Sequence, residues 1–451
     1  MAKRDPQGGS PSKRGPRPRI VPADGIPRAA LDRDALRVIH RLQKHRHEAY
    51  FVGGCVRDLW IGRDPKDFDV ATSAHPQEIR RLFRNGRIIG RRFRLVHIYY
   101  GDHIVETSTF RRDPSPDEDE EDGHRSEDML IVEDNVFGNA AEDARRRDFT
   151  VNGLFLDPAH HEIHDYVDGI RDLQDRVLRT IGDPMVRMAE DPVRILRAVK
   201  FATRLDFRID DATWEAMRHH VGQLSRSAPP RILEEILRLM RSGTAQGAFR
   251  MLRACGALEV LLPRLDTFLR GAAGGNSSER VAGVERFWKL LEALDSQVNH
   301  GDLRPSTALC VALLFHPLFE RERDPEGRLA RGPAGEPGRI AYDVVESFAG
   351  PTRLSRRDFG RARAILISQD RFLQSASKHF SPLLFARSEE FPEALQLFGL
   401  RVDARGQGRD IFQAWEDRQR RARDLADEEL DRERRRTHKR RHRRRRRRPS
   451  G

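Results

Sequence analysis

The sequence predicts a small α/β head followed by an all-α neck and body. Two observations lead to this prediction. Between residues 49 and 167, short apolar runs typical of strands alternate with helical segments, and from Met185 onward apolar residues recur almost wholly at helical spacing. The chain has 451 residues, enough for two or three domains with a sizeable core, and it contains no repeat of fixed period.

The positive charge of the chain is concentrated at its two ends. The net charge is +13, yet residues 434–448 carry twelve Lys and Arg without an acid, and residues 1–19 carry six with one acid. The remainder is mildly acidic. Arginine-rich segments of this kind bind nucleic-acid backbones without reading their sequence. The simpler interpretation is a solvated tail that keeps the protein soluble.

Several classes of protein do not fit the composition. No apolar run is long enough to span a bilayer, and the basic, Pro/Gly-rich N-terminus lacks the apolar stretch of a signal peptide. The three cysteines, Cys55, Cys255 and Cys310, are scattered without metal-type or redox-type spacing. We therefore expect a cytoplasmic protein with no membrane contact. The glycine signatures of P-loop and Rossmann proteins are also absent from the sequence.

The head is predicted to follow a disordered basic arm over residues 1–27. Leu36, Ile39 and Leu42 lie at helical spacing and predict a first helix over residues 31–45. The elements expected next are a strand over 49–52, a helix over 56–61, a strand over 67–71, a helix over 76–83, and a hairpin of 95–100 with 104–109.

The later segments complete the predicted layout. Residues 113–133 are expected to form an acidic mobile loop, because acids run unbroken from 117 to 122. A helix starting at 140 and a strand over 163–167 follow. The predicted parts are the head over 28–183, a helical neck or RNA-binding region over 184–265, a helical body over 266–430, and an Arg-rich disordered tail over 431–451.

Asp67 and Asp69 form the most informative chemical pattern. Successive side chains of a strand alternate between its faces, so these two acids would point the same way while Phe68 and Val70 face a core. Paired carboxylates repel each other unless a divalent cation lies between them. Glu106, on the second arm of the predicted hairpin, is a candidate third ligand. The alternative is an ordinary solvated strand face.

Upstream of the acids, Gly53-Gly54 opens a turn that contains Arg57. Glycines let a backbone approach a triphosphate closely, and an arginine can grip its oxygens through two hydrogen bonds. An ordinary strand-to-helix turn would show the same residues.

Two further motifs carry polar groups at defined spacing. The basic run that ends in Arg147, Asp148 and Asn152 suits phosphate and ribose hydroxyl groups, although a salt-bridged helix end explains it equally well. Asp191 fits a helix N-cap followed by Pro192, and Arg194 and Arg197 share one helix face. These three side chains can hydrogen-bond a base edge. A capped helix with surface arginines is the commoner case.

In this order and spacing, the motifs between about Ala49 and Pro263 resemble the class II nucleotidyltransferases of the polymerase β superfamily. This resemblance implies a polymerase β-like head, two-metal catalysis with Mg²⁺ (Mn²⁺ as the alternative ion), and ATP as the substrate. It implies the following residue roles: Asp67, Asp69 and Glu106 as metal ligands, Asp148 as a further catalytic acid, and Gly53, Gly54, Arg57, Lys66, Arg147, Asn152, Asp191, Arg194 and Arg197 as nucleotide-binding residues. Whether Glu106 or Asp148 is the true third carboxylate stays open.

The same family contains bacterial poly(A) polymerases and CCA-adding enzymes. The segments 88–98, 109–112 and 134–138, together with the Arg-rich tail, are similar to the poly(A) polymerases. The resemblance therefore implies template-independent addition of AMP to RNA 3′ ends, in support of RNA processing and decay, with the tail contacting the RNA backbone. CCA addition to tRNA is the first alternative. A non-catalytic RNA-binding adaptor on the same scaffold is the second.

Overall fold

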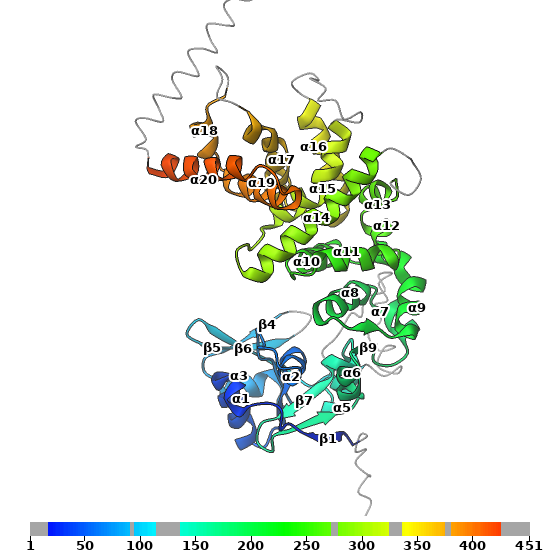
Figure 1. Cartoon of the computed structure of the whole chain (residues 1–451). Coiled ribbons are helices and arrows are strands. Elements are labelled where there is room, and N and C mark those ends of the chain that lie inside the picture. The colour runs from blue at the N-terminus through cyan, green and yellow to red at the C-terminus, as the bar shows by residue number, and fades with distance from the viewer. Residues whose placement is uncertain are drawn as a thin grey trace, which may run out of the picture. The chain divides into compact units, whose positions relative to one another are not determined.

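The computed structural model describes residues 17–90, 94–113, 136–271, 278–323, 336–374 and 380–424 (Figure 1). The chain divides into two compact units. The head unit consists of Met1–Arg194 and Asp206–His220, and the helical unit consists of Ile195–Leu205 and Val221–Gly451.

The head unit is built on a mixed sheet of eight strands in the order β1-β8-β7-β2-β3-β6-β5-β4. All neighbouring strands are antiparallel except β3 and β6, which run parallel with Val70 beside Thr107. The strands are β1 Arg19–Pro22, β2 Ala49–Val52, β3 Val70–Thr72, β4 Gly86–Ile89, β5 Leu95–Tyr100, β6 His103–Thr109, β7 Leu154–Asp157 and β8 Glu162–Asp165. A separate parallel pair joins β9 Val177–Leu178 to β10 Arg208–Ile209.

Short helices pack around this sheet. The α-helices of the head unit are α1 Arg33–Lys44, α2 Gly54–Trp60, α3 Pro76–Leu82, α5 Ala140–Arg146, α6 Gly169–Gln174, α7 Pro184–Glu190 and α9 Asp211–His220. The 3-10 turns are η1 Arg28–Ala30 and η2 Thr150–Asn152. An aromatic group of Tyr50, Phe110 and Phe155, with ring centroids 6.0–6.1 Å apart, lies in the core that supports the middle strands.

The helical unit contains α8 Val193–Leu205 from Ile195 on, and the α-helices that follow α9. These are α10 Pro229–Met240, α11 Ala245–Ala254, α12 Ala257–Leu261, α13 Pro263–Arg270, α14 Ser278–His300, α15 Thr307–Arg323, α16 Glu336–Thr352, α17 Arg356–Ser368, α18 Pro382–Ala386, α19 Phe391–Arg405 and α20 Arg409–Asp424, with η3 Val221–Arg226 and η4 Gln369–Leu373. Helix α15 is buried continuously from Ala308 to Phe319 and contacts α14, α16, α17 and α19. Within the described residues, no helix is both long and apolar enough to cross a membrane.

The predicted fold class is confirmed, and several element boundaries need correction. Strands β2 and β5 have the expected bounds. The disordered arm predicted over residues 1–27 is wrong from Arg19 on, because residues 19–22 pair with β8. The strand predicted over 67–71 begins only at Val70, so both acids precede it. Most of the predicted acidic loop and the whole Arg-rich tail lie outside the described residues.

Candidate active site

A glycine turn joins the central strand β2 of the head unit to α2. Gly53 has a φ of +74°, a backbone conformation that residues with a side chain rarely adopt. A Cβ atom added to Gly53 would also lie 2.8 Å from Nη1 of Arg147. At Gly54, an added Cβ would meet Arg57 at an ordinary contact distance of 3.6 Å. The fold therefore requires glycine at the first of the two positions.

Arg57 is buried beneath this turn, with only 2% of its surface exposed. Its Nε donates to Asp58 at 2.8 Å, and its Nη1 donates to the side-chain oxygen of Asn152. Asn152 in turn donates to Oδ1 of Asp148 at 3.0 Å. The guanidinium of Arg57 was expected to bind phosphate oxygens. It binds Asp58 and Asn152 instead and so holds the Asn152 amide in place.

Arg147 is a second arginine that lies against the glycine turn, beside Gly53. Its Nη2 pairs with Asp143 at 3.1 Å, its Nη1 donates to the backbone oxygen of Asn152 at 3.4 Å, and its guanidinium lies over the ring of Phe155. These three contacts fix the guanidinium beside Gly53. We call Gly53, Arg57, Arg147, Asp148 and Asn152 the Gly53 cluster, and the structure brings together these predicted site residues.

The acidic residues lie where β3 and β6 run side by side. The backbone oxygen of Asp69 accepts from the amide of Val52, so the segment before β3 already pairs with β2. Phe68 packs on Phe51 with ring centroids 5.6 Å apart, as expected for a core-facing residue between two acids. Val70 follows Asp69 and Thr107 follows Glu106, and these two following residues lie opposite each other in the parallel pairing of β3 with β6.

The pairing of β3 with β6 brings Glu106 beside Asp69, and Asp67 lies two residues before Asp69. The pKa of the Asp69 carboxyl is raised to about 6, chiefly by burial and also by the charges of Glu106 and Asp67, while the charge of Arg147 opposes the rise. Asp67 and Glu106 are exposed, and Glu106 lies 3.4 Å from Nε2 of His97. In the described part of the chain, no three His, Cys, Asp or Glu side chains already surround a single point as metal ligands would.

The donor set nevertheless fits a divalent cation. Oxygen ligands from carboxylates are what Mg²⁺ prefers, and a cation would relieve the repulsion that raises the pKa of Asp69. Asp148 is engaged differently, because its Oδ1 accepts from the amide of Phe149 at 2.9 Å as well as from Asn152. Of the two candidates for the third carboxylate, Glu106 is the one that acts on Asp69.

The three residues predicted to hydrogen-bond the base of the nucleotide are each held by different partners. The Asp191 side chain accepts from the amide of Val193 at 3.2 Å, at the start of α8. In the head unit, Arg194 donates to Glu190 at 3.1 Å and to the backbone oxygen of Arg187. In the helical unit, Arg197 pairs with Glu235 at 3.8 Å and lies over the ring of Phe201.

Sequence reasoning missed the acids that hold these arginines. Glu190 could have been found, because it precedes Arg194 by four residues and such pairs meet on a helix. Asp143 has the same spacing to Arg147. Glu235 lies 38 positions after Arg197, and no local pattern marks it. Lys66, a predicted nucleotide ligand, is exposed and makes no hydrogen bond or ion pair with any described residue.

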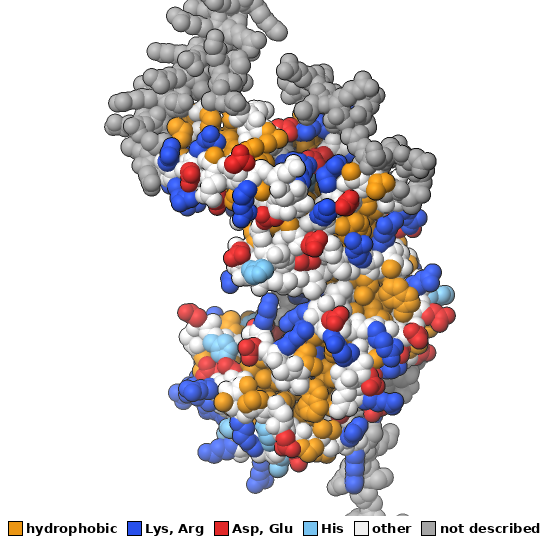
Figure 2. Space-filling model, in the orientation of Figure 1, with side chains coloured by type: hydrophobic (Ala, Val, Ile, Leu, Met, Phe, Trp, Pro, Cys, Tyr) orange, Lys and Arg blue, Asp and Glu red, His pale blue; other side chains and the backbone are white. Residues whose placement is uncertain are grey.

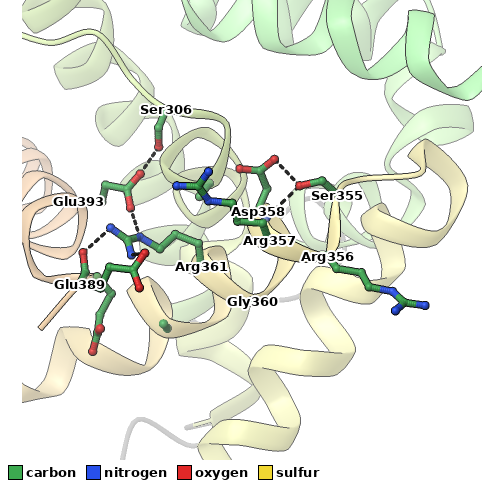
Figure 3. A pocket seen from close by; sticks show the side chains of 12 residues that line it. Ser306, Ser355, Arg356, Arg357, Asp358, Gly360, Arg361, Glu389 and Glu393 are labelled. Carbon is green, nitrogen blue, oxygen red and sulfur yellow. Dashed lines mark hydrogen bonds and ion pairs between the residues drawn. The ribbon is translucent and has the colours of Figure 1, made fainter.

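The helical unit contains a groove of about 750 Å³ along α17 (Figure 3). Its charged groups largely neutralise one another: Arg361 pairs with Glu389 and Glu393, and Ser355 donates to Asp358. Arg356 and Arg357 are exposed in the same groove. The face of the helical unit seen in Figure 2 likewise shows basic and acidic side chains interspersed. The groove presents no catalytic grouping.

Three family models match successive parts of the chain. The model described as "Poly A polymerase head domain" matches residues 49–179. "Probable RNA and SrmB- binding site of polymerase A" matches residues 206–269, and "Polymerase A arginine-rich C-terminus" matches residues 339–449. The first of these ranges contains the Gly53 cluster and all three acids.

Individual relatives agree with these models. Poly(A) polymerase I of Salmonella typhi is 38% identical over 329 residues, which cover 72% of this chain and 68% of that protein. Poly(A) polymerase I of Haemophilus influenzae is 34% identical over 383 residues, covering 83% and 82%. Among solved structures, the CCA-adding enzyme of Bacillus stearothermophilus in complex with CTP is 25% identical, with a TM-score of 0.62 and coverage of 86% and 81%.

Proposed function

The chain belongs to the poly(A) polymerase family and is an RNA-adenylating nucleotidyltransferase, and we propose that the Gly53 cluster and the neighbouring acids form its active site. The reaction adds AMP from ATP to the 3′ end of RNA without a template. The 3′-hydroxyl oxygen forms a bond to the α-phosphorus of ATP, and pyrophosphate leaves. The observation that carries this assignment is that Gly53, Arg147 and Asp69 lie together at one end of the central strands β2 and β3.

Each residue of the Gly53 cluster has a distinct task in this proposal. Gly53 has no side chain to keep a triphosphate away from the backbone, and Arg147 supplies positive charge next to it. Arg57 does not contact the substrate in this proposal. It fixes the side-chain amide of Asn152, and that amide orients the ribose or a phosphate of ATP. Lys66, exposed and without a partner among the described residues, is free to turn toward the phosphates.

The acids complete the proposed site. Asp67, Asp69 and Glu106 would hold Mg²⁺, with Mn²⁺ as the alternative ion. A cation bound there would lower the pKa of the attacking hydroxyl and would neutralise charge on the reacting phosphate. With its pKa at about 6, the Asp69 carboxyl is mostly ionised at neutral pH. A bound cation would offset the burial and the like charges that raise this pKa.

Selection of adenine is assigned to Asp191, Arg194 and Arg197. Glu190 and Arg187 hold Arg194 in one orientation, and Glu235 does the same for Arg197. Guanidinium groups fixed in this way can hydrogen-bond the edge of one base, whereas a different base would leave their donors unpaired. Unpaired donors of this kind discriminate strongly between nucleotides.

The RNA substrate and the cellular location extend the proposal. The descriptions of two matched models, an RNA-binding region and an arginine-rich C-terminus, support contact with RNA. We assign backbone contacts to residues 434–448, where twelve Lys and Arg occur without an acid. The three buried cysteines are free thiols, which suits the reducing cytoplasm.

A primer-extension gel tests the function. The protein and Mg²⁺ are incubated with a short unstructured RNA or a tRNA lacking its CCA end, with ATP alone, CTP alone, or both. We expect a long ladder on the unstructured RNA with ATP alone. Extension limited to the tRNA, requiring CTP and stopping after one terminal A, would instead identify a CCA-adding enzyme. The reactions are repeated with Mn²⁺ in place of Mg²⁺, and no incorporation with either cation would indicate a non-catalytic adaptor.

A further inference from the structure

A small cavity lies within the helical unit where α14, α15 and α19 meet. Its charged and titratable lining residues are Arg286, His316, Glu320, Arg401 and Arg405. The cavity has a volume of about 10 Å³, enough for roughly one water-sized group. None of these residues belongs to the proposed active site.

The lining carries more positive than negative charge. Glu320 is its single carboxylate and accepts from Nη2 of Arg401 at 2.9 Å and from Nη2 of Arg405 at 3.0 Å. Burial lowers the pKa of His316 to about 3, so its imidazole is neutral at pH 7. Arg286 lines the same cavity, its charge acts on Glu320, and its buried Nε has no acceptor among the described residues. Three guanidinium groups therefore face one carboxylate.

Two buried donors in this lining have no acceptor among the described residues. They are the Nε atoms of Arg401 and Arg286. Arg401 is 8% exposed, and its Nη1 is fixed by the side-chain oxygen of Gln369. A buried cationic donor without an acceptor is costly, and such sites are usually completed by water or an anion.

Nearby acids do not balance the excess. Asp370 pairs with Arg323, and Glu322 pairs with Arg264 at 2.6 Å. Each of these acids is thus matched by a cation of its own. The cavity therefore keeps an excess of positive charge. This charge is carried by planar guanidinium groups, whose N–H donors suit an oxyanion.

We propose that this cavity binds one phosphate group, with a single oxygen inserted among Arg286, Arg401 and Arg405. The small volume excludes a nucleobase and leaves the rest of the ligand outside. A phosphodiester of the RNA substrate has this chemistry, an assignment that rests on the proposed function, and so does free inorganic phosphate. In either case the site lies on helices that carry no catalytic residue.

The test uses the full-length protein and Arg286→Gln, which removes a charge without breaking an internal hydrogen bond. Arg356→Gln, in the groove along α17, is the matched control, and Arg286→Lys restores the charge. Binding of a labelled RNA is measured across a salt series in one arm. The melting temperature is measured against inorganic phosphate at constant ionic strength in the other.

If RNA supplies the phosphate, Arg286→Gln lowers RNA affinity by about tenfold, as expected when a charge-assisted hydrogen bond is removed. The slope of log affinity against log salt then falls by about 0.7. If inorganic phosphate is the ligand, the variant loses phosphate-induced stabilisation and keeps its RNA affinity. Both arms matching the Arg356→Gln control would overturn the proposal. Primer extension by the wild-type protein separately reports whether the proposed function holds.

Discussion

Asp69 is the single residue on which the proposed chemistry depends most directly. Replacing it with Asn keeps its size and removes its charge, so we expect AMP addition to fall by at least about 100-fold, as when one group that stabilises transition-state charge is removed. Folding should be preserved, because burial already opposes the charged form. Primer-extension rates and melting temperatures measure the two effects.

Asp102→Asn provides the control for this variant. Asp102 is an exposed residue in the turn between β5 and β6, and it belongs to the same unit. It should retain the wild-type rate. Near-normal activity of Asp69→Asn would contradict the assignment of Asp69 to the metal site.

Gly53 offers a test of backbone geometry. Gly53→Ala places a side chain at a φ of +74° and brings its Cβ to 2.8 Å from Arg147. The φ of +74° with a ψ of −126° costs a residue with a side chain on the order of 1–3 kcal/mol, and displacement of Arg147 should reduce activity as well. Gly101→Ala separates the two effects, because Gly101 has a φ of +62° with no atom within 4 Å of the added Cβ.

Chemical denaturation and primer extension of both glycine variants give the comparison. Similar losses of stability with a loss of activity only in Gly53→Ala would match the expectation. Equal activity in the two variants would show that the position of Arg147 beside Gly53 does not matter for the reaction.

The residues of the proposed active site differ in how far the sequence alone could predict them. Gly53, Arg147 and Asn152 come from two short motifs whose spacing reflects local backbone turns, so a pattern reveals them. Their partners are set by tertiary packing. Arg57 donates to Asn152, which lies 95 positions later, and Arg197 pairs with Glu235. Both contacts depend on how segments that are distant in the sequence pack together. No periodicity encodes such contacts.

At the scale of elements, the junction of α14, α15 and α19 makes stability depend on pH. The folded protein keeps the buried His316 imidazole neutral, with its pKa near 3, whereas the unfolded chain binds a proton near pH 6.5. Stability from this group is therefore full above pH 6.5 and is lost as the pH falls toward 3. The slope approaches about 1.4 kcal/mol per pH unit.

Urea denaturation between pH 7 and pH 4.5 measures this dependence. The window excludes most titration of Glu320, whose pKa the neighbouring cations hold at about 2 against the effect of burial. His316→Gln should flatten the pH dependence, while the exposed His300→Gln should leave it unchanged. A wild-type slope in His316→Gln would contradict the assignment.

Strands were harder to predict than helices. The strand β2 and the hairpin of β5 and β6 combine β-forming residues with a clear turn, so local sequence suffices. The two outer strands, β1 and β4, are four residues long and have a partner on one side only. Ile20 is 48% exposed. Short outer strands of this kind become strands through pairing with a distant segment, which composition does not show.

At the scale of the whole molecule, the concentration of charge in one segment predicts a strong effect on RNA binding. Replacing the Lys and Arg of residues 434–448 with Gln keeps the length and removes twelve positive charges. We expect weaker binding of unstructured RNA and a flatter salt dependence, with the slope reduced by about 0.7 for each RNA phosphate that the tail no longer neutralises.

Filter binding across a salt series checks this expectation, with extension of a saturating primer as the control for an intact active site. Identical salt slopes for the variant and the wild-type protein would exclude a role of the tail in RNA binding. A loss of extension at saturating RNA would point to an effect on folding or catalysis instead.

The pairing of β1 with β8 has a consequence for how the protein is made. Arg19 lies opposite Asp165, so the first strand of the head finds its partner almost 150 residues later. During synthesis the sheet cannot be completed until β8 has left the ribosome, and contacts between residues so far apart in the sequence form slowly. Until then β1 lacks its partner and β7 lacks the neighbour on its outer side, so the nascent head presents an unpaired strand to chaperones and to other unfinished chains.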